Sequence, residues 1–155
     1  MAATLLPHRI ELTDEPPSQE RDMLAVPLLA YNEALLGPSG IRPVAVLIRS
    51  QDDARLLGGL WGRTSFQRLF VELLFIPEAL RGQGIGTRLL RAAEDEAKAR
   101  GCLGAWLETF SPDACRFYVQ QGYEVFGVIA DYPPGNTRSF LSRQFPTWVR
   151  CHQGP

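Results

Sequence analysis

The fold of this 155-residue chain is decided by the stretch Leu80-Arg81-Gly82-Gln83-Gly84-Ile85-Gly86-Thr87. The stretch lies between an apolar segment, residues 69–76, and an amphipathic segment that runs to Arg100, which predicts a strand–turn–helix unit. Alternating glycines let the backbone turn tightly and leave its N–H groups uncovered. Those N–H groups open a helix, where four donors lack partners and the helix dipole is positive. The sequence therefore predicts an anion site suited to a diphosphate.

The glycine loop differs from two common nucleotide-binding loops. A P-loop has Lys directly after its last glycine, whereas Ile85 and Thr87 flank Gly86 here, and the dinucleotide fingerprint needs a further glycine at position 87. The pattern Arg81-x-x-Gly84-x-Gly86 instead resembles the acetyl-CoA loop of the GNAT-type N-acetyltransferases. The alternative is a glycine-rich turn that binds nothing.

Composition favours one globular domain over residues 1–155, with a core at about 8–145 and a loose tail at 146–155. Hydrophobic residues make up 45% of the chain, charged residues 21%, and the net charge is −1. Nucleic-acid binding is not expected without a surplus of positive charge, and no apolar run approaches the ~20 residues of a membrane span. Positive charge rests on arginine, because Lys98 is the only lysine.

The cysteines and histidines point away from disulfide or metal chemistry. Cys102, Cys115 and Cys151 are odd in number and form no Cys-x-x-Cys pair, so we expect reduced thiols in a cytoplasmic protein. The two histidines, His8 and His152, lie near opposite ends of the chain. A histidine-centred triad or a histidine-rich metal site is therefore not expected, and no metal is predicted.

Hydrophobic periodicity and turn residues predict a mixed α/β domain with a mostly antiparallel central sheet flanked by helices. Pro27 lies inside the first helical pattern and is expected to kink it or to restart it as a second helix. In the helix after the glycine loop, Glu94–Lys98 and Glu96–Arg100 are expected as stabilising pairs. Strands are predicted at residues 8–13, 44–48, 56–62, 69–76, 103–109, 123–129 and 137–145, and helices at 85–100 and 112–121. A first helix is predicted after Ser18, with apolar positions at Leu24, Leu28, Tyr31 and Leu35.

The order of these elements is that of the GNAT family, and a second motif supports the resemblance. The segment Tyr118-Val119-Gln120-Gln121-Gly122-Tyr123 is similar to the family's Tyr-x-x-x-Gly-Phe pattern, with Tyr123 at the aromatic place. The resemblance covers residues 8–145 and implies a GNAT-like acyl-CoA-binding fold and the transfer of an acetyl group from acetyl-CoA to a primary amine.

The resemblance also implies which residues bind the cofactor. The loop residues Arg81, Gly82, Gln83, Gly84, Ile85, Gly86 and Thr87 would hold the diphosphate of coenzyme A. The backbone of Leu74, Phe75 and Ile76 would pair with the pantetheine arm, and a backbone N–H near Leu74 or Phe75 would polarise the acetyl carbonyl. Many relatives have Asn at the place of Ser111, so the shorter serine puts that pantetheine contact in doubt.

Tyr118 lies where family members have a tyrosine that protonates the leaving thiolate. From the residues alone, Tyr118 shares a helix face with Ala114, Phe117 and Gln121, and it could equally be a core tyrosine. The motif favours the catalytic interpretation.

Two carboxylates compete for the role of base that deprotonates the amine. Glu72 is the one charge in the apolar strand before the loop, and a charge there needs a partner or a function. The alternatives are a salt bridge with an arginine, or a base at Glu108 on the neighbouring strand. The loop at residues 131–135 is either a rigid hairpin turn or a wall of the acceptor site.

The sequence favours a small-molecule amine as acceptor and does not name it. A protein amine, a non-catalytic acyl-CoA sensor and a structural domain are the alternatives. A homodimer is also predicted, with the tail around Trp148 as a candidate contact.

Overall fold

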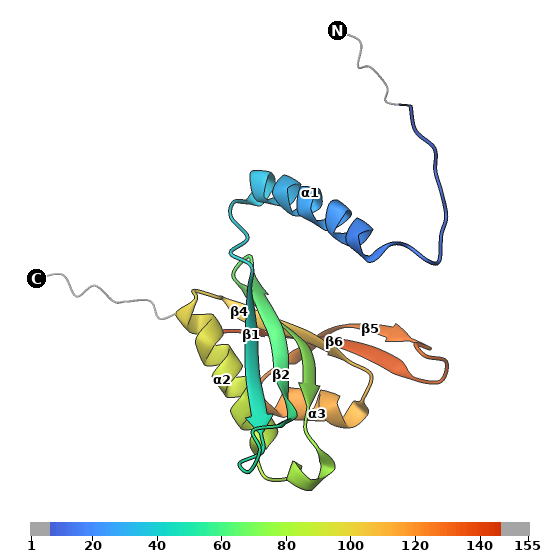
Figure 1. Ribbon diagram of the computed structural model, residues 1–155. Coiled ribbons are helices and arrows are strands. Elements are labelled where there is room, and N and C mark those ends of the chain that lie inside the picture. Colours follow the sequence, from blue (N-terminus) through green and yellow to red (C-terminus); the bar gives the residue numbers. More distant parts are fainter. Residues whose placement is uncertain (1–6, 147–155) are drawn as a thin grey trace, which may run out of the picture. The chain divides into compact units, whose positions relative to one another are not determined.

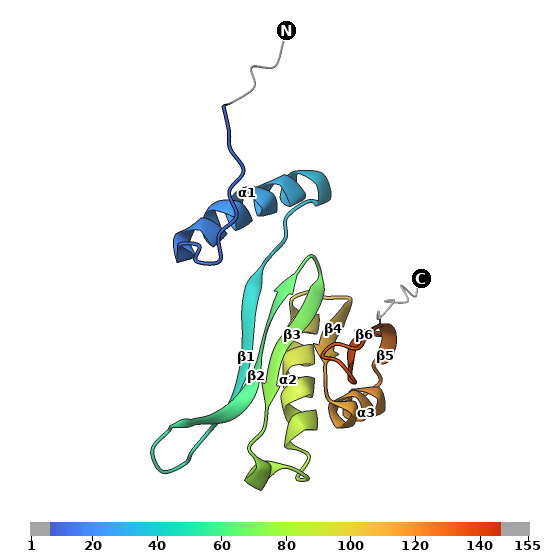
Figure 2. The same ribbon diagram turned by 90° about the vertical axis from the view of Figure 1, so that its right-hand side faces the viewer.

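The computed structural model describes residues 7–146, which fall into two compact units, Met1–Pro38 and Ser39–Pro155. Figure 1 and Figure 2 together label the α-helices and strands of both units. The predicted tail at 146–155 and Trp148 lie outside the described residues, except for Pro146.

The prediction of a strand at residues 8–13 is wrong. These residues are exposed and belong to no strand, with Ile10 96% and Leu12 100% exposed. Arg9 forms an ion pair within the segment, with Glu11. A strand needs a partner for its backbone groups, and the apolar alternation of this segment does not supply one.

The first unit contains one continuous helix, α1 (Ser18–Leu36), with Pro27 inside it. The predicted restart at Pro27 is therefore wrong, although a proline removes one backbone hydrogen bond from a helix interior. None of the helix residues is buried. Gly37, with a φ of 87°, ends the helix, and its N–H donates to Glu33 O.

The second unit is a six-stranded sheet in the order β1-β2-β3-β4-β6-β5, with two helices. Only the β3–β4 pair is parallel, so the predicted mixed, mostly antiparallel sheet is confirmed. The elements are β1 (Arg42–Arg49), β2 (Leu56–Ser65), β3 (Arg68–Phe75), the 3-10 turn η1 (Glu78–Leu80), α2 (Ile85–Ala99), β4 (Gly104–Thr109), α3 (Pro112–Gln120), β5 (Glu124–Ala130) and β6 (Thr137–Gln144).

One hydrophobic core joins the sheet to both helices of the second unit. Helix α2 packs along β1–β3 (Figure 2) and α3 packs against β4–β6. Strand alternation sends every second side chain to this core, for example Leu69 and Val71 of β3. The fully buried large aliphatic side chains are Leu60, Leu69, Leu90, Leu107 and Leu141.

The charged side chains of helix α2 differ in their burial and in their ion-pair partners. Glu96 pairs with Arg100 at 2.7 Å, as expected. The expected Glu94–Lys98 pair is wrong, because Glu94 is 1% exposed and faces the core. The Lys98 ammonium instead pairs with Asp95 at 3.0 Å and lies over the Phe145 ring at 5.2 Å.

Strand β3 carries an irregularity at Glu72. Trp61 of β2 lies opposite Leu73 and Gly62 lies opposite Val71, so Glu72 has no backbone pairing partner on β2. A bulge of this kind reverses which side chains face the core beyond it, and Leu74 and Ile76 pack against the core. The side chains on the opposite face are therefore uncovered in the last residues of β3, where Leu73 is 65% and Phe75 59% exposed.

Candidate active site

The two parallel strands of the sheet separate halfway along their length. Strands β3 and β4 pair from Arg68↔Gly104 to Val71↔Leu107, and no further. Beyond that point β4 stays paired with β6 as far as Thr109, whereas β3 continues to Phe75 paired only with β2. The edge of β3 that faces β4 therefore presents unpaired backbone groups from Glu72 onwards. Such an edge can add an extended ligand as a further strand. Leu74, Phe75 and Ile76, the predicted pantetheine contacts, lie at this edge.

The glycine loop continues directly from that edge. Gly82 and Gly84 have φ values of 71° and 73°, a conformation that glycine adopts without steric cost. A Cβ at either position would meet no atom within 4 Å, so the loop is open on the side of these glycines.

A row of backbone donors lines the loop. Helix α2 begins after Gly84 without a side-chain cap, and its first helical bond runs from Arg88 N to Gly84 O at 3.1 Å. The six consecutive N–H groups from Gly82 to Thr87 have no acceptor among the described residues. Six unpartnered donors at the positive end of a helix are an arrangement that favours anions, and the predicted diphosphate site at this loop stays a prediction.

Two loop side chains hold the backbone in place. Arg81 Nε donates to Ile76 O at 3.0 Å and Gln83 Nε2 donates to Ala79 O at 3.0 Å. Gly86 has a different reason to be glycine, because a Cβ there would lie 3.2 Å from both Ile76 Cδ1 and Phe117 Cζ. The third glycine thus lets α2 pack closely against the end of β3 and against α3.

Ser111 is the N-cap of α3, and its Oγ accepts a hydrogen bond from Ala114 N at 3.2 Å. The helix predicted at 112–121 therefore starts at Pro112, as expected. Ser111 also lines a cavity of about 350 Å³. The other lining residues are Phe110, Pro112, Cys115, Gly135, Asn136, Thr137 and Ser139.

Tyr118 is 5% exposed, on the face of α3 that packs against the core. Its ring contacts the rings of Phe117 and Tyr123, with centroid distances of 5.1 and 5.9 Å. Its hydroxyl forms no hydrogen bond with any described residue. Burial raises the pKa of this hydroxyl to about 12, so it stays protonated at neutral pH.

The two candidate bases stand where β3 and β4 separate. Glu72 and Glu108 each follow the last paired residue of their strand, Val71 and Leu107. Glu72 forms an ion pair with Arg63 of β2, and Glu108 forms one with Arg138 of β6. Both carboxylate side chains remain accessible, 30% and 27% exposed. The arginine salt bridge considered for Glu72 is therefore present, and it leaves part of the carboxylate open to solvent.

The separation begins beside a stacked aromatic pair. Phe70 of β3 and Trp106 of β4 lie ring on ring, with centroids 3.9 Å apart and planes 13° apart. The guanidinium of Arg63 lies over the other side of Phe70 at 5.0 Å. This stack reinforces the paired half of the two strands directly before they part.

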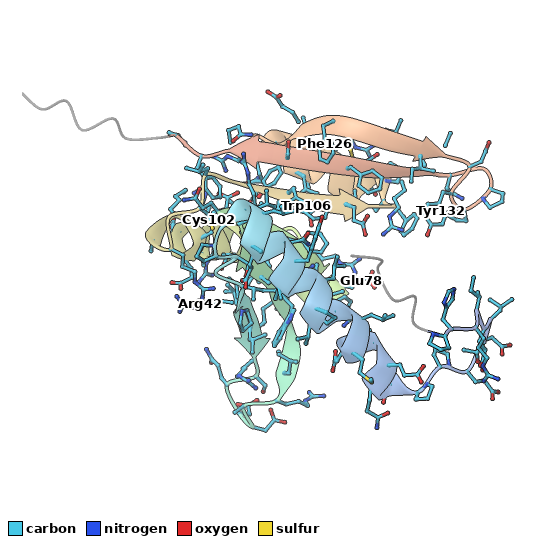
Figure 3. All side chains as sticks on the ribbon, turned by 90° about the horizontal axis from the view of Figure 1, so that it is seen from above. Arg42, Glu78, Cys102, Trp106, Phe126 and Tyr132 are labelled. Atoms are coloured by element: carbon cyan, nitrogen blue, oxygen red, sulfur yellow. The ribbon has the colours of Figure 1, made fainter. Side chains whose placement is uncertain are left out.

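The β5–β6 hairpin ends in the loop at residues 131–135, where Tyr132 lies (Figure 3). Gly135 N donates to Asp131 Oδ1 at 3.2 Å inside the loop. Arg138 Nη1 donates to the Tyr132 hydroxyl at 3.1 Å, and the guanidinium lies 4.6 Å from the Phe110 ring. The hydrogen bond to Glu108 is the main cause of a raised pKa at Arg138. Arg138 thus ties the loop to the end of β4.

Sequence reasoning missed a buried polar network. Glu94 of α2 accepts hydrogen bonds from the Tyr123 hydroxyl and from Arg143 Nη1, both at 2.9 Å. The available signal was Glu94 itself, an acid next to Ala93 and Ala97 on the apolar stripe of the helix. Because Lys98 follows four residues later, the sequence favours a surface ion pair for Glu94 instead.

Residues 7–146 contain no group of three or more His, Cys, Asp or Glu that could hold a metal ion. No helix in the same range is both long and apolar enough to cross a membrane.

The chain is similar to several known proteins. Residues 8–123 match the acetyltransferase (GNAT) family. Acetyltransferase Atu2258 of Agrobacterium fabrum is 41% identical over 134 residues, which cover 86% of this chain and 97% of that protein. A crystal structure of an acetyltransferase from Agrobacterium tumefaciens superimposes with a TM-score of 0.85 at 40% identity, covering 89% of this chain and all of that one. The blasticidin-S acetyltransferase of Streptomyces morookaense is 41% identical over 90 residues, 57% of this chain and 66% of that protein.

Proposed function

The chain belongs to the acetyltransferase (GNAT) family, and from that premise we propose that it acetylates a primary amine of a small molecule, with Tyr118 as general acid. The family membership makes the chain an acetyl-CoA-dependent N-acetyltransferase. The acceptor and the residues that carry the chemistry are the subject of the proposal.

One observation carries the assignment of the cofactor site. The unpaired edge of β3 leads directly into the six N–H groups of the loop, from Gly82 to Thr87. A pantetheine arm offers amides that can pair with such an edge, and a diphosphate offers the oxygens that such a loop needs. Leu74, Phe75 and Ile76 would bind the arm, and residues 81–87 would bind the diphosphate. Ser111 already caps α3, so its proposed contact would use the remaining capacity of its hydroxyl.

The base is proposed to be Glu72. An alkyl ammonium with a pKa near 10 must lose its proton before it can attack, which costs about 4 kcal/mol at pH 7. Glu72 stands where β3 leaves β4, with 30% of its side chain exposed, so an amine or a bridging water can reach it. Arg63 holds the carboxylate in place, and this ion pair must weaken when Glu72 accepts the proton. Glu108 has the matching position on β4 and is the alternative base.

Tyr118 is proposed to protonate the departing thiolate of coenzyme A. Three properties support this role: Tyr118 is only 5% exposed, its hydroxyl has no partner among the described residues, and a pKa of about 12 keeps that hydroxyl protonated at neutral pH. In this step the phenol O–H bond breaks and a thiol S–H bond forms. The ammonium loses one proton before it attacks, and the attacking nitrogen loses a second one as the C–S bond breaks. One of these two protons returns the tyrosinate to phenol through solvent and the other is released, so the proton balance closes over one turnover.

A small molecule is favoured as acceptor by the relatives. One relative carries the name blasticidin-S acetyltransferase and another is named IAA acetyltransferase, at 41% and 36% identity over parts of the chain. Glu72 and Glu108 flank the point where the strands separate, an arrangement that favours a cationic amine. The loop at 131–135, fixed by Arg138, is proposed as a wall of the acceptor site. A protein amine is the alternative acceptor.

The test is a thiol-release assay with acetyl-CoA and a panel of amines: blasticidin S, spermidine, tyramine and n-butylamine. Tyr118→Phe should lower kcat by about 10²–10⁴-fold, the usual contribution of a general acid, with an unchanged KM for acetyl-CoA. Glu72→Gln should lower turnover most at pH values below the pKa of the amine. Glu108→Gln is its matched partner.

The outcomes separate the roles. Full kcat in Tyr118→Phe would remove the general-acid role, and a larger loss in Glu108→Gln than in Glu72→Gln would move the base to β4. A wild-type protein that binds acetyl-CoA in calorimetry but acetylates no amine, peptide amines included, would instead be a binding domain.

A further inference from the structure

Three elements meet in a buried polar network around Glu94. Tyr123, directly before β5, donates its hydroxyl to Glu94 Oε1, and Arg143 of β6 donates Nη1 to Glu94 Oε2, both at 2.9 Å. Glu94 is 1% and Tyr123 2% exposed. Burial is the main cause of a raised pKa at Tyr123, and the charge of Glu94 adds to it. The network therefore joins α2, the start of β5 and β6 through one carboxylate.

Tyr123 is also the residue that contacts Tyr118 in two independent ways. Its backbone N–H donates to Tyr118 O at 3.0 Å and closes the end of α3. Its ring meets the Tyr118 ring edge to face, with centroids 5.9 Å apart. Tyr118 itself has no hydrogen bond at its hydroxyl to any described residue. Its ring orientation is therefore set by packing alone, and Tyr123 supplies one side of that packing.

Stability alone does not explain a carboxylate at this place. Burying a charged group is costly, and well-packed apolar residues often replace a buried ion pair at no loss of stability or with a gain. A phenylalanine at position 123 and an apolar residue at position 94 would fill the same space. A fully satisfied polar network does something that apolar packing does less well, because it fixes its members in one arrangement.

We propose that Tyr123, anchored by Glu94 and Arg143, is a positioning residue that holds the Tyr118 ring in the orientation needed to donate its proton. The proposal rests on the general-acid role proposed for Tyr118. Tyr123 touches neither the acetyl group nor the amine. It acts through Tyr118, and its hydroxyl serves as the fixed point of the arrangement.

The experiment compares Tyr123→Phe with wild type in the thiol-release assay, using acetyl-CoA and the panel amine with the highest turnover. The variant keeps the ring that touches Tyr118 and removes only the anchor. A proton donor displaced by a fraction of an ångström loses efficiency steeply, so kcat should fall about 10-fold while the KM for acetyl-CoA stays the same. Val44→Ala, a buried residue of β1, is the stability control: it should lower the melting temperature without lowering kcat at 25 °C.

A double-mutant cycle separates positioning from a general loss of structure. In a Tyr118→Phe background there is no donor left to position, so Tyr123→Phe should have no further effect on kcat. Glu94→Gln keeps an oxygen for the Tyr123 hydroxyl and should retain more of kcat than Glu94→Ala does.

Unchanged kcat in Tyr123→Phe would overturn the proposal, and so would an equal fall in both backgrounds. Failure of the general-acid role has a different signature, since full kcat in the single variant Tyr118→Phe would remove that role and the positioning role together. Tyr123→Phe with a lower melting temperature but normal kcat would identify the network as purely structural.

Discussion

The raised pKa of the Tyr118 hydroxyl leads to a prediction that does not depend on turnover. This hydroxyl has an ordinary pKa of 10.0 in the unfolded chain and a pKa of about 12 in the fold. The folded state therefore holds this proton more tightly, so the stabilisation is complete below pH 10 and is lost as pH rises through 12. Between pH 9 and pH 11.5 wild type should lose about 2 kcal/mol more unfolding free energy than Tyr118→Phe.

Urea unfolding of both proteins at the two pH values measures that difference. The other titratable groups are the same in wild type and in Tyr118→Phe, so their contributions cancel in the comparison. Parallel losses of stability in wild type and variant would show that the hydroxyl is not buried in solution.

At the scale of elements, the two ends of α2 offer a matched pair of glycines. Gly84 precedes the helix and Gly101 follows it, with φ values of 73° and 82°. A Cβ at either position meets no atom within 4 Å, so aspartate causes similar backbone strain at both. Only Gly84→Asp places a negative charge beside the unpaired N–H groups. Like charges brought together cost several kcal/mol, so the affinity for acetyl-CoA should fall by about 100-fold or more.

Isothermal titration calorimetry with acetyl-CoA measures the affinity, and thermal melting checks the fold. Gly101→Asp should bind acetyl-CoA as wild type does, with a similar decrease in melting temperature. An affinity for acetyl-CoA equal to that of wild type in both variants would show that the loop is not part of the cofactor site. Equal losses in both would point to strain rather than charge.

At the scale of the whole molecule, the core and the proposed cofactor site lie in one unit. The buried apolar residues extend from Val44 to Phe145, and α1 has no buried residue. A chain that begins at Ser39 should therefore fold and bind acetyl-CoA as the full chain does. Circular dichroism and calorimetry test this, and an unfolded fragment would show that residues before Ser39 are needed for folding. The single domain, the cytoplasmic location and the homodimer stay predictions.

The sequence predicted what depends on neighbours along the chain. Alternation, caps and glycines placed the strands from β1 to β6 and both helices of the second unit within a few residues. The failures involve partners distant in sequence. The segment at 8–13 has strand-like alternation without a strand to pair with, and Glu94 has a lysine four residues away but bonds to Tyr123 and Arg143 instead. The arginine partners of Glu72 and Glu108 come from adjacent strands, which only the order of the sheet reveals.

The scarcity of lysine matters for an enzyme whose reagent acetylates amines. Acetyl thioesters modify lysine side chains slowly even without catalysis, and each event removes a positive charge. This chain has 16 basic residues of which one is lysine, and its ammonium is engaged by Asp95 and the Phe145 ring. The remaining 15 side chains are guanidinium groups, which stay protonated and are therefore poor nucleophiles. Fifteen of the sixteen basic side chains are thus groups that the acyl donor leaves unmodified.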